Sequence, residues 1–191
     1  MHNLKYKIID NTKAILGESP VYDQATSSFY WIDILGKKIF NYSIKTNKFY
    51  EIKTKGLVGL ITNYDQQYML VGISNSLFKL NKFTNKFKLL THLPNIYKSY
   101  RFNDGEIDMN KNLWFGLVKK NKNIKKGILM KLSPGLKPFV INDKYKTPNG
   151  PVFNNKRKIF YSVDSSKKII YCYSNLNHTT MKRKIFKKFN F

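Results

Sequence analysis

The sequence predicts an all-β protein with the architecture of a β-propeller. Its 191 residues contain short apolar runs separated by turn residues, arranged as four successive units of four runs each. The second run of each unit ends at Asp33, Gly72, Gly116 and Asp164, so the spacings are 39, 44 and 48 residues. A period of this length with four strands per unit is typical of propeller blades, and no helical periodicity of comparable length competes with it.

The first two units supply eight expected strands, each bounded by turn-forming residues. We expect strands at 21–23, 29–33, 38–42 and 49–52 in the first unit and at 60–62, 68–72, 76–80 and 87–90 in the second. In a propeller the innermost strand of each blade lines a central channel, and the loop that enters it lies at one mouth of that channel.

The last two units follow the same order. Their expected strands are 106–108, 113–116, 127–132 and 138–141, and then 151–153, 159–163, 169–173 and 183–186. The run Asn103-Asp104-Gly105 predicts a turn just before the first of these strands. Around 183–186, basic residues alternate with apolar ones, which predicts an outer strand with a solvated face.

Length and composition predict a single domain over residues 1–191. Hydrophobic residues make up 42% and aromatic residues 15%, as in a globular chain and unlike a disordered one. No apolar run approaches membrane-spanning length, and residues 1–14 lack the apolar core of a secretory signal, so we expect a cytoplasmic protein with no membrane partner. The single cysteine, Cys172, excludes an intramolecular disulfide and a cysteine zinc site.

The formal net charge of +24 would suit a nucleic-acid-binding protein. However, only Arg101, Arg157 and Arg183 are arginine, and the lysines are spread along the chain among many Asn, Ile, Tyr and Phe residues, whose codons are A/T-rich. We therefore attribute the charge to an A/T-biased genome and expect no nucleic-acid partner. The competing hypothesis, a nucleic-acid binder, predicts a localised patch and binding that weakens steeply with salt.

Three oxygen-bearing side chains occupy equivalent places in the repeat. Glu18, Asn103 and Asn149 lie three, four and three residues before the inner-strand residues Val21, Ile107 and Val152. The second unit has 56–59 at this place, with no oxygen donor. Carboxylate and amide oxygens without His or Cys suit a hard cation such as calcium or magnesium, with manganese or zinc as further candidates. In the alternative interpretation these side chains only cap turns.

Nucleophilic catalysis finds no support in the sequence. His2, His92 and His178 lie near the terminus or in expected loops, and none stands beside a Ser or Cys in a recognised arrangement. Trp31 and Trp114 share one repeat position and are expected to be core aromatics.

Six ordered motifs carry a resemblance to a known family. They are LGESPVYD at 16–23, YWIDI at 30–34, RFNDG at 101–105, LWFG at 113–116, PNG at 148–150 and VDS at 163–165. Their order and spacing are similar to those of the senescence marker protein, gluconolactonase and luciferin-regenerating enzyme family, from about Leu16 to the last residue. The resemblance implies a six-bladed propeller, with about four blades in this chain, and a central divalent metal ion that serves lactone hydrolysis.

By position, the resemblance implies that Glu18 and Asn149 are metal ligands and that Arg101 and Asn103 hold the substrate, a sugar lactone. The implied cofactor is one divalent ion, calcium first, with manganese, magnesium or zinc as alternatives. Such an ion polarises the lactone carbonyl while a carboxylate base activates water for the attack.

Two departures from the family pattern set limits on this expectation. After Gly116 the family has acidic residues that reach the substrate, whereas this sequence has Leu117-Val118-Lys119-Lys120-Asn121. The family's next landmark, a Pro-Asp-Gly turn with the third metal ligand and presumed base, has no counterpart here, so the catalytic residue is unknown and we expect impaired hydrolysis. Residues 4–9 resemble the strand that completes the family's last blade. The alternative function is a non-catalytic metal-binding or interaction propeller.

Overall fold

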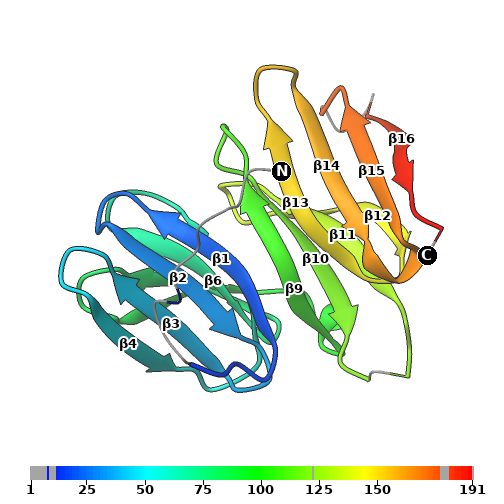
Figure 1. Cartoon of the computed structure of the whole chain (residues 1–191). Coiled ribbons are helices and arrows are strands. Elements are labelled where there is room, and N and C mark those ends of the chain that lie inside the picture. Colours follow the sequence, from blue (N-terminus) through cyan, green and yellow to red (C-terminus); the bar gives the residue numbers. More distant parts are fainter. Residues whose placement is uncertain (1–7, 9–11, 122, 177–180, 191) are drawn as a thin grey trace.

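The computed structural model describes residues 8, 12–121, 123–176 and 181–190. These residues form four antiparallel sheets of four strands, which we call blades 1 to 4 in chain order (Figure 1). Helix in the described part of the chain is limited to two short 3₁₀ turns, Asn95–Tyr97 and Ser165–Lys167, and neither has the length or apolarity that crossing a membrane requires. The prediction of an all-β propeller with four blades is confirmed.

Each blade is one uninterrupted stretch of chain whose strands pair in sequence order. Blade 1 comprises β1 (Gly17–Asp23), β2 (Ser28–Asp33), β3 (Lys38–Ser43) and β4 (Lys48–Lys53). Blade 2 comprises β5 (Val58–Asn63), β6 (Tyr68–Ile73), β7 (Ser76–Asn81) and β8 (Phe87–His92). Blade 3 comprises β9 (Tyr100–Ile107), β10 (Leu113–Lys119), β11 (Gly127–Leu132) and β12 (Pro138–Tyr145). Blade 4 comprises β13 (Pro148–Asn154), β14 (Ile159–Asp164), β15 (Ile169–Ser174) and β16 (Lys182–Lys188).

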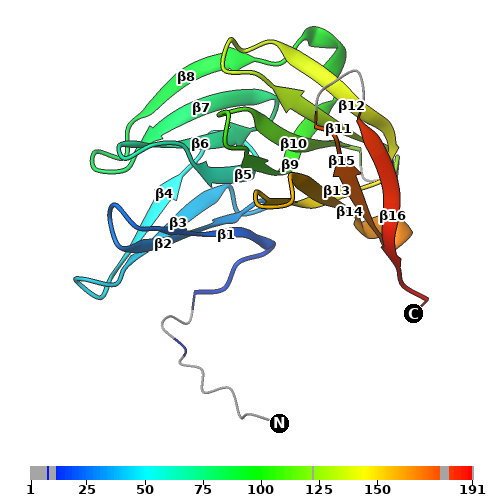
Figure 2. The same ribbon diagram turned by 90° about the horizontal axis from the view of Figure 1, so that it is seen from above.

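The blades fan out around their first strands. In the view from above, β5, β9 and β13 lie toward the middle of the molecule, and β8, β12 and β16 lie at the periphery (Figure 2). Strand β5 packs against both β1 and β9, and β9 also packs against β13. The first strand of every blade is therefore the inner strand, and residues at the starts of these four strands share one mouth of the channel.

The inner strands begin earlier than the sequence predicts. Residues 100–105 are part of β9, so the prediction of a turn at Asn103-Asp104-Gly105 is wrong. The physical reason is a β-bulge. Asp104 pairs with Gly116 and Phe102 pairs with Leu117, which leaves Asn103 as the extra residue within a continuing strand.

The hydrophobic core consists of layers between neighbouring blades. Ile32 and Tyr30 of blade 1 pack against Val71 of blade 2, and the next layer contains Leu60 and Phe102. The third layer packs Trp114 and Leu129 of blade 3 against Phe160 and Tyr173 of blade 4. Each blade thus supplies apolar side chains on the faces that meet its neighbours, as expected for strands with a period of two.

The two tryptophans do not occupy equivalent core positions. Trp114 is fully buried between blades 3 and 4. Trp31 is only half-buried, against Phe40 and Phe49 of its own blade, while Tyr30 and Ile32 on either side of it pack toward blade 2. Successive side chains in a strand face opposite ways, so an alignment error of one residue changes the face. The prediction that Trp31 and Trp114 share a repeat position is therefore wrong.

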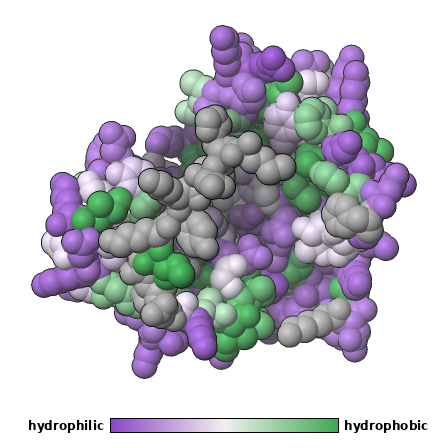
Figure 3. Space-filling model, in the orientation of Figure 1, coloured by the Kyte–Doolittle hydropathy of each residue, from purple (hydrophilic) through white to green (hydrophobic). Residues whose placement is uncertain are grey.

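The lysine-rich segment 182–188 forms β16 at the outer edge of blade 4, as predicted, and all of its side chains are exposed. Charged side chains on an edge strand oppose pairing with another sheet edge. Hydrophilic side chains project from much of the molecular face in Figure 3. Of the other predicted features, His2, His178 and the strand at 4–9, apart from Ile8, lie outside the described residues.

Candidate functional site

The four residues singled out by the sequence lie on three inner strands, at the same mouth of the channel. Glu18 is on β1, Arg101 and Asn103 are on β9, and Asn149 is on β13. β-bulges in these inner strands lie at or beside Glu18, Asn103 and Asn149. In β1 the pairing is irregular between Glu18 and Val21, and in β13 it is irregular between Asn149 and Val152. The irregular pairing thus directly follows Glu18 and Asn149, whereas in β9 it falls on Asn103 itself.

The backbone immediately after Glu18 and Asn149 has the same unusual conformation. Ser19 has a φ of 50° and Gly150 has a φ of 53°, both in the left-handed region. Glycine adopts this region readily, whereas serine does so at a cost. Two different sequences thus adopt the same backbone conformation directly after the predicted ligands in blades 1 and 4.

Blade 2 contributes a glycine at the corresponding bulge. Gly59 is the extra residue between Val58 and Leu60 in the pairing of β5 with β6. A Cβ atom at this position would lie 1.9 Å from the carbonyl oxygen of Phe102 and 3.3 Å from the backbone nitrogen of Asn103. Blade 2 therefore lacks a donor side chain here because β9 approaches its backbone too closely for one.

A short hydrogen-bond network joins the polar side chains of blades 3 and 4. Asn103 donates from Nδ2 to Asn149 Oδ1 at 2.9 Å and to the Pro148 carbonyl at 3.0 Å. Arg101 donates from Nη1 to Asn103 Oδ1 at 3.0 Å and to the Phe102 carbonyl at 2.8 Å. These contacts fix the orientation of both amides, so the Asn149 amide oxygen has a defined position.

Asp104 lies at the centre of this region, although spacing did not mark it as a site residue. Its Oδ2 accepts the N–H of Gly150 at 2.7 Å, and its Oδ1 accepts the N–H of Gly105 at 2.8 Å. The hydroxyl of Ser19 donates to the same Oδ1 at 3.4 Å. One carboxylate of blade 3 therefore contacts both blade 1 and blade 4, beside Glu18 and Asn149.

Two buried aspartates hold the segments that lead into β1 and β13. Asp33 accepts the backbone N–H groups of Ile15 and Leu16 at 2.9 and 3.0 Å. Asp164 does the same for Lys146 and Thr147, at 2.8 and 3.0 Å. Next to Asp164, Ser165 accepts a hydrogen bond from Asn149 Nδ2 at 3.0 Å. The segments that lead into β1 and β13 are thus anchored to the end of the second strand in their own blades.

The charged groups of the site affect one another. Burial raises the pKa of the Glu18 carboxyl, the Asp104 carboxylate raises it further, and the Arg101 guanidinium opposes both effects. Burial likewise raises the pKa of Asp104, against the lowering effect of its N–H and hydroxyl donors. Burial lowers the pKa of Arg101, and Glu18 opposes that shift. Because the Asp104 carboxylate disfavours the charged form of Glu18, a cation beside Glu18 is favourable.

The donor set fits a hard divalent cation. Among the described residues, no hydrogen bond ends on the Glu18 carboxylate, and the Asn149 amide oxygen, which accepts from Asn103, retains a second lone pair. The same part of the chain has no cluster of three His, Cys, Asp or Glu side chains that would hold an ion. One carboxylate and neutral amide oxygens suit calcium, and they match the usual nitrogen and sulfur ligands of zinc poorly.

The segment after Gly116 does not contribute to this site. Leu117 is buried in the core between blades 2 and 3. Lys119 donates to the Ser99 hydroxyl at 2.7 Å, and Lys120 donates to the Lys98 carbonyl at 2.8 Å. Both ammonium groups are therefore used within blade 3 and the segment that leads into it.

One histidine differs from the sequence prediction. His92 lies at the end of β8, opposite Ser76, and its Nδ1 shares a hydrogen bond of 2.8 Å with the Ser76 hydroxyl. The expectation that His92 lies in a loop is wrong, because it is the last residue of β8, and the pairing of β7 with β8 brings Ser76 beside it. The pair lies on the third and fourth strands of blade 2, away from the inner strands that carry the candidate site.

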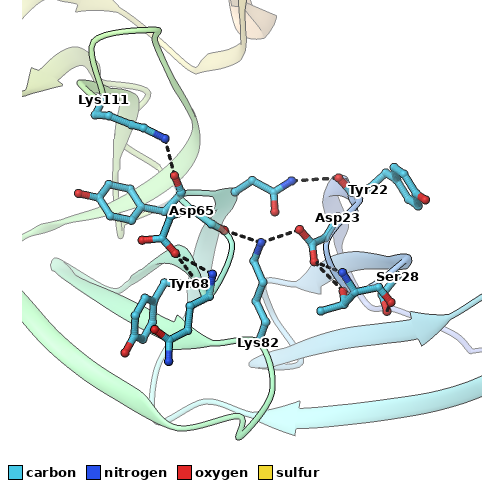
Figure 4. Close-up of polar contacts among 11 residues, drawn as sticks. Tyr22, Asp23, Ser28, Asp65, Tyr68, Lys82 and Lys111 are labelled. Atoms are coloured by element: carbon cyan, nitrogen blue, oxygen red, sulfur yellow. Dashed lines mark hydrogen bonds and ion pairs between the residues drawn. The ribbon is translucent and has the colours of Figure 1, made fainter.

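The opposite mouth of the channel has a separate polar cluster. A cavity of about 520 Å³ is lined there by Asp23, Asn63, Lys82 and Glu106, among others. Lys82 forms an ion pair of 2.5 Å with Asp23, with side-chain exposures of 1% and 4%, and it also donates to the Asp65 carbonyl at 2.8 Å (Figure 4). Lys82 belongs to blade 2 and Asp23 to blade 1, so this ion pair joins the two blades.

Comparison with known proteins gives a consistent picture. The sequence profile described as "SMP-30/Gluconolactonase/LRE-like region" matches residues 16–190. The chain is 26% identical over 166 residues to the putative sugar lactone lactonase YvrE of Bacillus subtilis (strain 168), with 86% of this chain and 56% of that protein covered. It is 22% identical over 171 residues to the 6-deoxy-6-sulfogluconolactonase of Pseudomonas putida, with 90% and 59% covered.

Solved structures show the same fold. A luciferin-regenerating enzyme superposes with a TM-score of 0.85 at 21% identity, covering 95% of this chain and 64% of that chain. The calcium-binding protein regucalcin from Agrobacterium tumefaciens str. C58 superposes with a TM-score of 0.83 at 20% identity, covering 94% and 61%. The chain thus spans between half and two thirds of the length of these relatives.

Proposed function

Because this chain belongs to the SMP-30/gluconolactonase/LRE-like family, we propose that it contributes to the metal-dependent hydrolysis of a sugar lactone. The observation that carries the proposal is the position of Glu18, Asn103 and Asn149, from three blades, at one channel mouth, with Asp104 hydrogen-bonded to the residues that follow Glu18 and Asn149. Lactonases are among the related proteins. Metal dependence and the identity of the substrate are the parts of this proposal that experiment must test.

In this proposal Glu18 and Asn149 hold one divalent cation, with calcium the first candidate and magnesium, manganese or zinc the alternatives. A relative of the same fold is a calcium-binding protein, and the donor set favours oxygen-loving ions. When bound, such an ion supplies Lewis-acid polarisation of a carbonyl. The Asn103 amide, which donates to the Asn149 amide oxygen, holds that oxygen in place for the cation.

Arg101 and Asn103 are the proposed substrate-binding residues. One terminal nitrogen of the Arg101 guanidinium is engaged by the Phe102 carbonyl and the Asn103 amide oxygen. A guanidinium has five N–H donors in a rigid plane, so the remaining donors suit the hydroxyl and ring oxygens of a sugar lactone. Replacing Arg101 with lysine should weaken catalysis more than metal binding, since a point charge does not reproduce this planar fork.

The general base is the missing part of the mechanism. Both oxygens of Asp104 accept hydrogen bonds from protein donors, which makes it a poor acceptor for a proton from water. No position of this sequence matches the family's third ligand and presumed base. We therefore propose that the chain by itself binds a divalent ion but hydrolyses lactones little above the background of the metal alone.

The alternative function is a non-catalytic metal-binding or interaction propeller. The observation that favours it is the use of Lys119 and Lys120 within blade 3, where the family pattern has acidic residues that reach the substrate. This alternative predicts metal binding without lactone opening even when excess metal is present.

Two measurements separate the alternatives. Calorimetric titration with calcium, manganese and magnesium measures ion binding by the wild type and by Glu18→Ala, which should lose it. A pH-stat assay of aldonolactone opening, run with and without protein at each metal concentration, measures turnover. Turnover that is weak but saturable, metal-dependent and abolished in Glu18→Ala supports the lactonase. Binding with no turnover above the background of the metal alone supports the alternative, and unchanged binding in Glu18→Ala refutes the proposed ligand.

A further inference from the structure

We infer that Asp104 is a positioning residue for the site, a carboxylate that fixes the backbone beside both proposed metal ligands. Its two oxygens accept from Gly150, Gly105 and Ser19 at 2.7, 2.8 and 3.4 Å. Gly150 directly follows Asn149, and Ser19 directly follows Glu18. The roles of Glu18 and Asn149 as metal ligands in this inference rest on the proposed function. The contacts of Asp104 are independent of it.

The contacts of Asp104 fall on the two left-handed residues that directly follow the proposed ligands. Ser19 and Gly150 both have left-handed φ angles, 50° and 53°, and a non-glycine residue in that region persists only when its surroundings hold it there. The bulge after each proposed ligand sets the direction of the ligand side chain. A single carboxylate from blade 3 therefore sets the relative positions of a ligand in blade 1 and a ligand in blade 4.

An amide at position 104 would not serve equally well. The carboxylate receives three donors on two oxygens, and both oxygens of an ionised carboxylate are acceptors. In Asp104→Asn one of these oxygens becomes an NH₂ group that faces an N–H donor, whichever way the amide is turned. The variant keeps the size of the side chain and loses at least one contact.

Glu106 provides a matched control on the same strand. Two residues further along β9, its Oε1 accepts the Thr62 hydroxyl at 2.8 Å and the N–H of Ile107 at 2.8 Å. It therefore resembles Asp104 in joining its own backbone to a neighbouring blade. However, it contacts blade 2 and lies toward the opposite end of the inner strands, so Glu106→Gln tests the loss of a half-buried carboxylate without disturbing Ser19 or Gly150.

The first experiment compares metal binding by the wild type, Asp104→Asn and Glu106→Gln with calorimetric titration of calcium and manganese. Loss of a residue that orients metal ligands typically costs 10–100-fold in affinity, so we expect a Kd about 10–100 times higher for Asp104→Asn. We expect a Kd within about twofold of wild type for Glu106→Gln. Equal affinities of wild type and Asp104→Asn, or equal losses in the two variants, would overturn the inference.

The second experiment needs no metal. Amide hydrogen exchange followed by NMR should show the Gly150 N–H protected in the wild type, exchanging at least about tenfold faster in Asp104→Asn, and unchanged in Glu106→Gln. Unchanged protection of Gly150 in Asp104→Asn would refute the positioning role. If the wild type bound no divalent ion, the proposed function would fail, and the exchange data would still decide whether Asp104 holds this backbone.

A milder variant covers the case in which Asp104→Asn does not fold. Ser19→Ala removes only the hydroxyl donor and leaves both N–H contacts of Asp104. We expect it to raise the metal Kd about two- to threefold, since the lost contact is the longest of the three. No change in either the metal Kd or the exchange of the backbone amide at position 19 would count against the contact with blade 1.

Discussion

Replacing Lys82 with methionine removes the cation from a buried ion pair that joins blade 1 to blade 2. The Lys82 ammonium lies 2.5 Å from Asp23 and 2.8 Å from the Asp65 carbonyl, and the two charged side chains are 1% and 4% exposed. Figure 4 shows the ammonium between these two partners. Methionine has a similar shape, so the variant tests the charge and its hydrogen bonds more than the packing.

The expected cost follows from what the variant leaves behind. Removing one partner of a buried pair typically destabilises by about 3–5 kcal/mol, because the other charge stays buried. Asp23 retains hydrogen bonds from the Thr26 N–H and hydroxyl at 3.0 and 2.6 Å, which places the cost at the lower end, about 3 kcal/mol. For a chain of this size, that corresponds to a fall in Tm of about 6–12 °C.

Differential scanning calorimetry and urea unfolding measure this loss. The matched control is Lys38→Met, which breaks an exposed ion pair of 2.9 Å with Glu51, with side-chain exposures of 35% and 32%. Exposed pairs contribute about 0–1 kcal/mol. The double variant Asp23→Asn/Lys82→Met should be more stable than either single variant, since no charge is then left unpaired. Equal effects of Lys82→Met and Lys38→Met on the free energy of unfolding would refute the reasoning.

Three other predictions concern the site and its surroundings. Calcium at 100 times its Kd should raise the Tm by about 5–10 °C in the wild type and should leave the Tm of Glu18→Ala unchanged. If calorimetry showed an equal rise in both proteins, Glu18 would be excluded as a ligand. Gly59→Ala should destabilise the fold by at least about 3 kcal/mol, because the added Cβ would lie 1.9 Å from the Phe102 carbonyl oxygen. Gly135→Ala is the control and should not destabilise it, since the nearest heavy atom to the added Cβ would be 3.9 Å away. Similar denaturant midpoints for the two variants would contradict the close approach of β9. Burial raises the pKa of Asp33, but backbone N–H donors outweigh it and lower the pKa overall, so its stabilising contribution is present above pH 3.8 and is lost as the pH falls below that value. Urea midpoints between pH 7 and pH 3 should therefore fall less steeply in Asp33→Asn, and an unchanged slope would count against these hydrogen bonds.

The blades could be predicted from the sequence, while the ends of their inner strands could not. Apolar runs with a period of two, separated by turn residues, predict strands such as 29–33 and 76–80 within a residue or so of β2 and β7. The inner strands contain bulges in which polar residues continue the strand, and residues such as Asn103 and Gly105 have the composition of a turn. Local composition does not distinguish a bulge from a turn, so the predicted strands begin too late.

The site was predicted in part, for a similar reason. Equivalent places in a repeat converge around one axis, which brings Glu18, Asn103 and Asn149 to one mouth. The contacts of Asp104 join residues 46 and 85 positions apart in the chain, and such contacts depend on how blades dock. An alignment of the repeat by strand ends is also one residue out for Trp31, since β2 ends at Asp33 but β10 continues past Gly116 to Lys119.

The separation of Asp104 from its partners has a consequence for the order of folding. Within a blade, strands pair with sequence neighbours, so hairpins close short loops at little entropic cost. The contacts of Asp104 with Ser19 and Gly150 close loops of 85 and 46 residues, and long loops close late. In refolding chains, we expect the amides that pair β10 with β11 to gain protection from exchange before the Gly150 amide does. The polar mouth of the channel would then be a late product of folding, assembled on blades that are already formed.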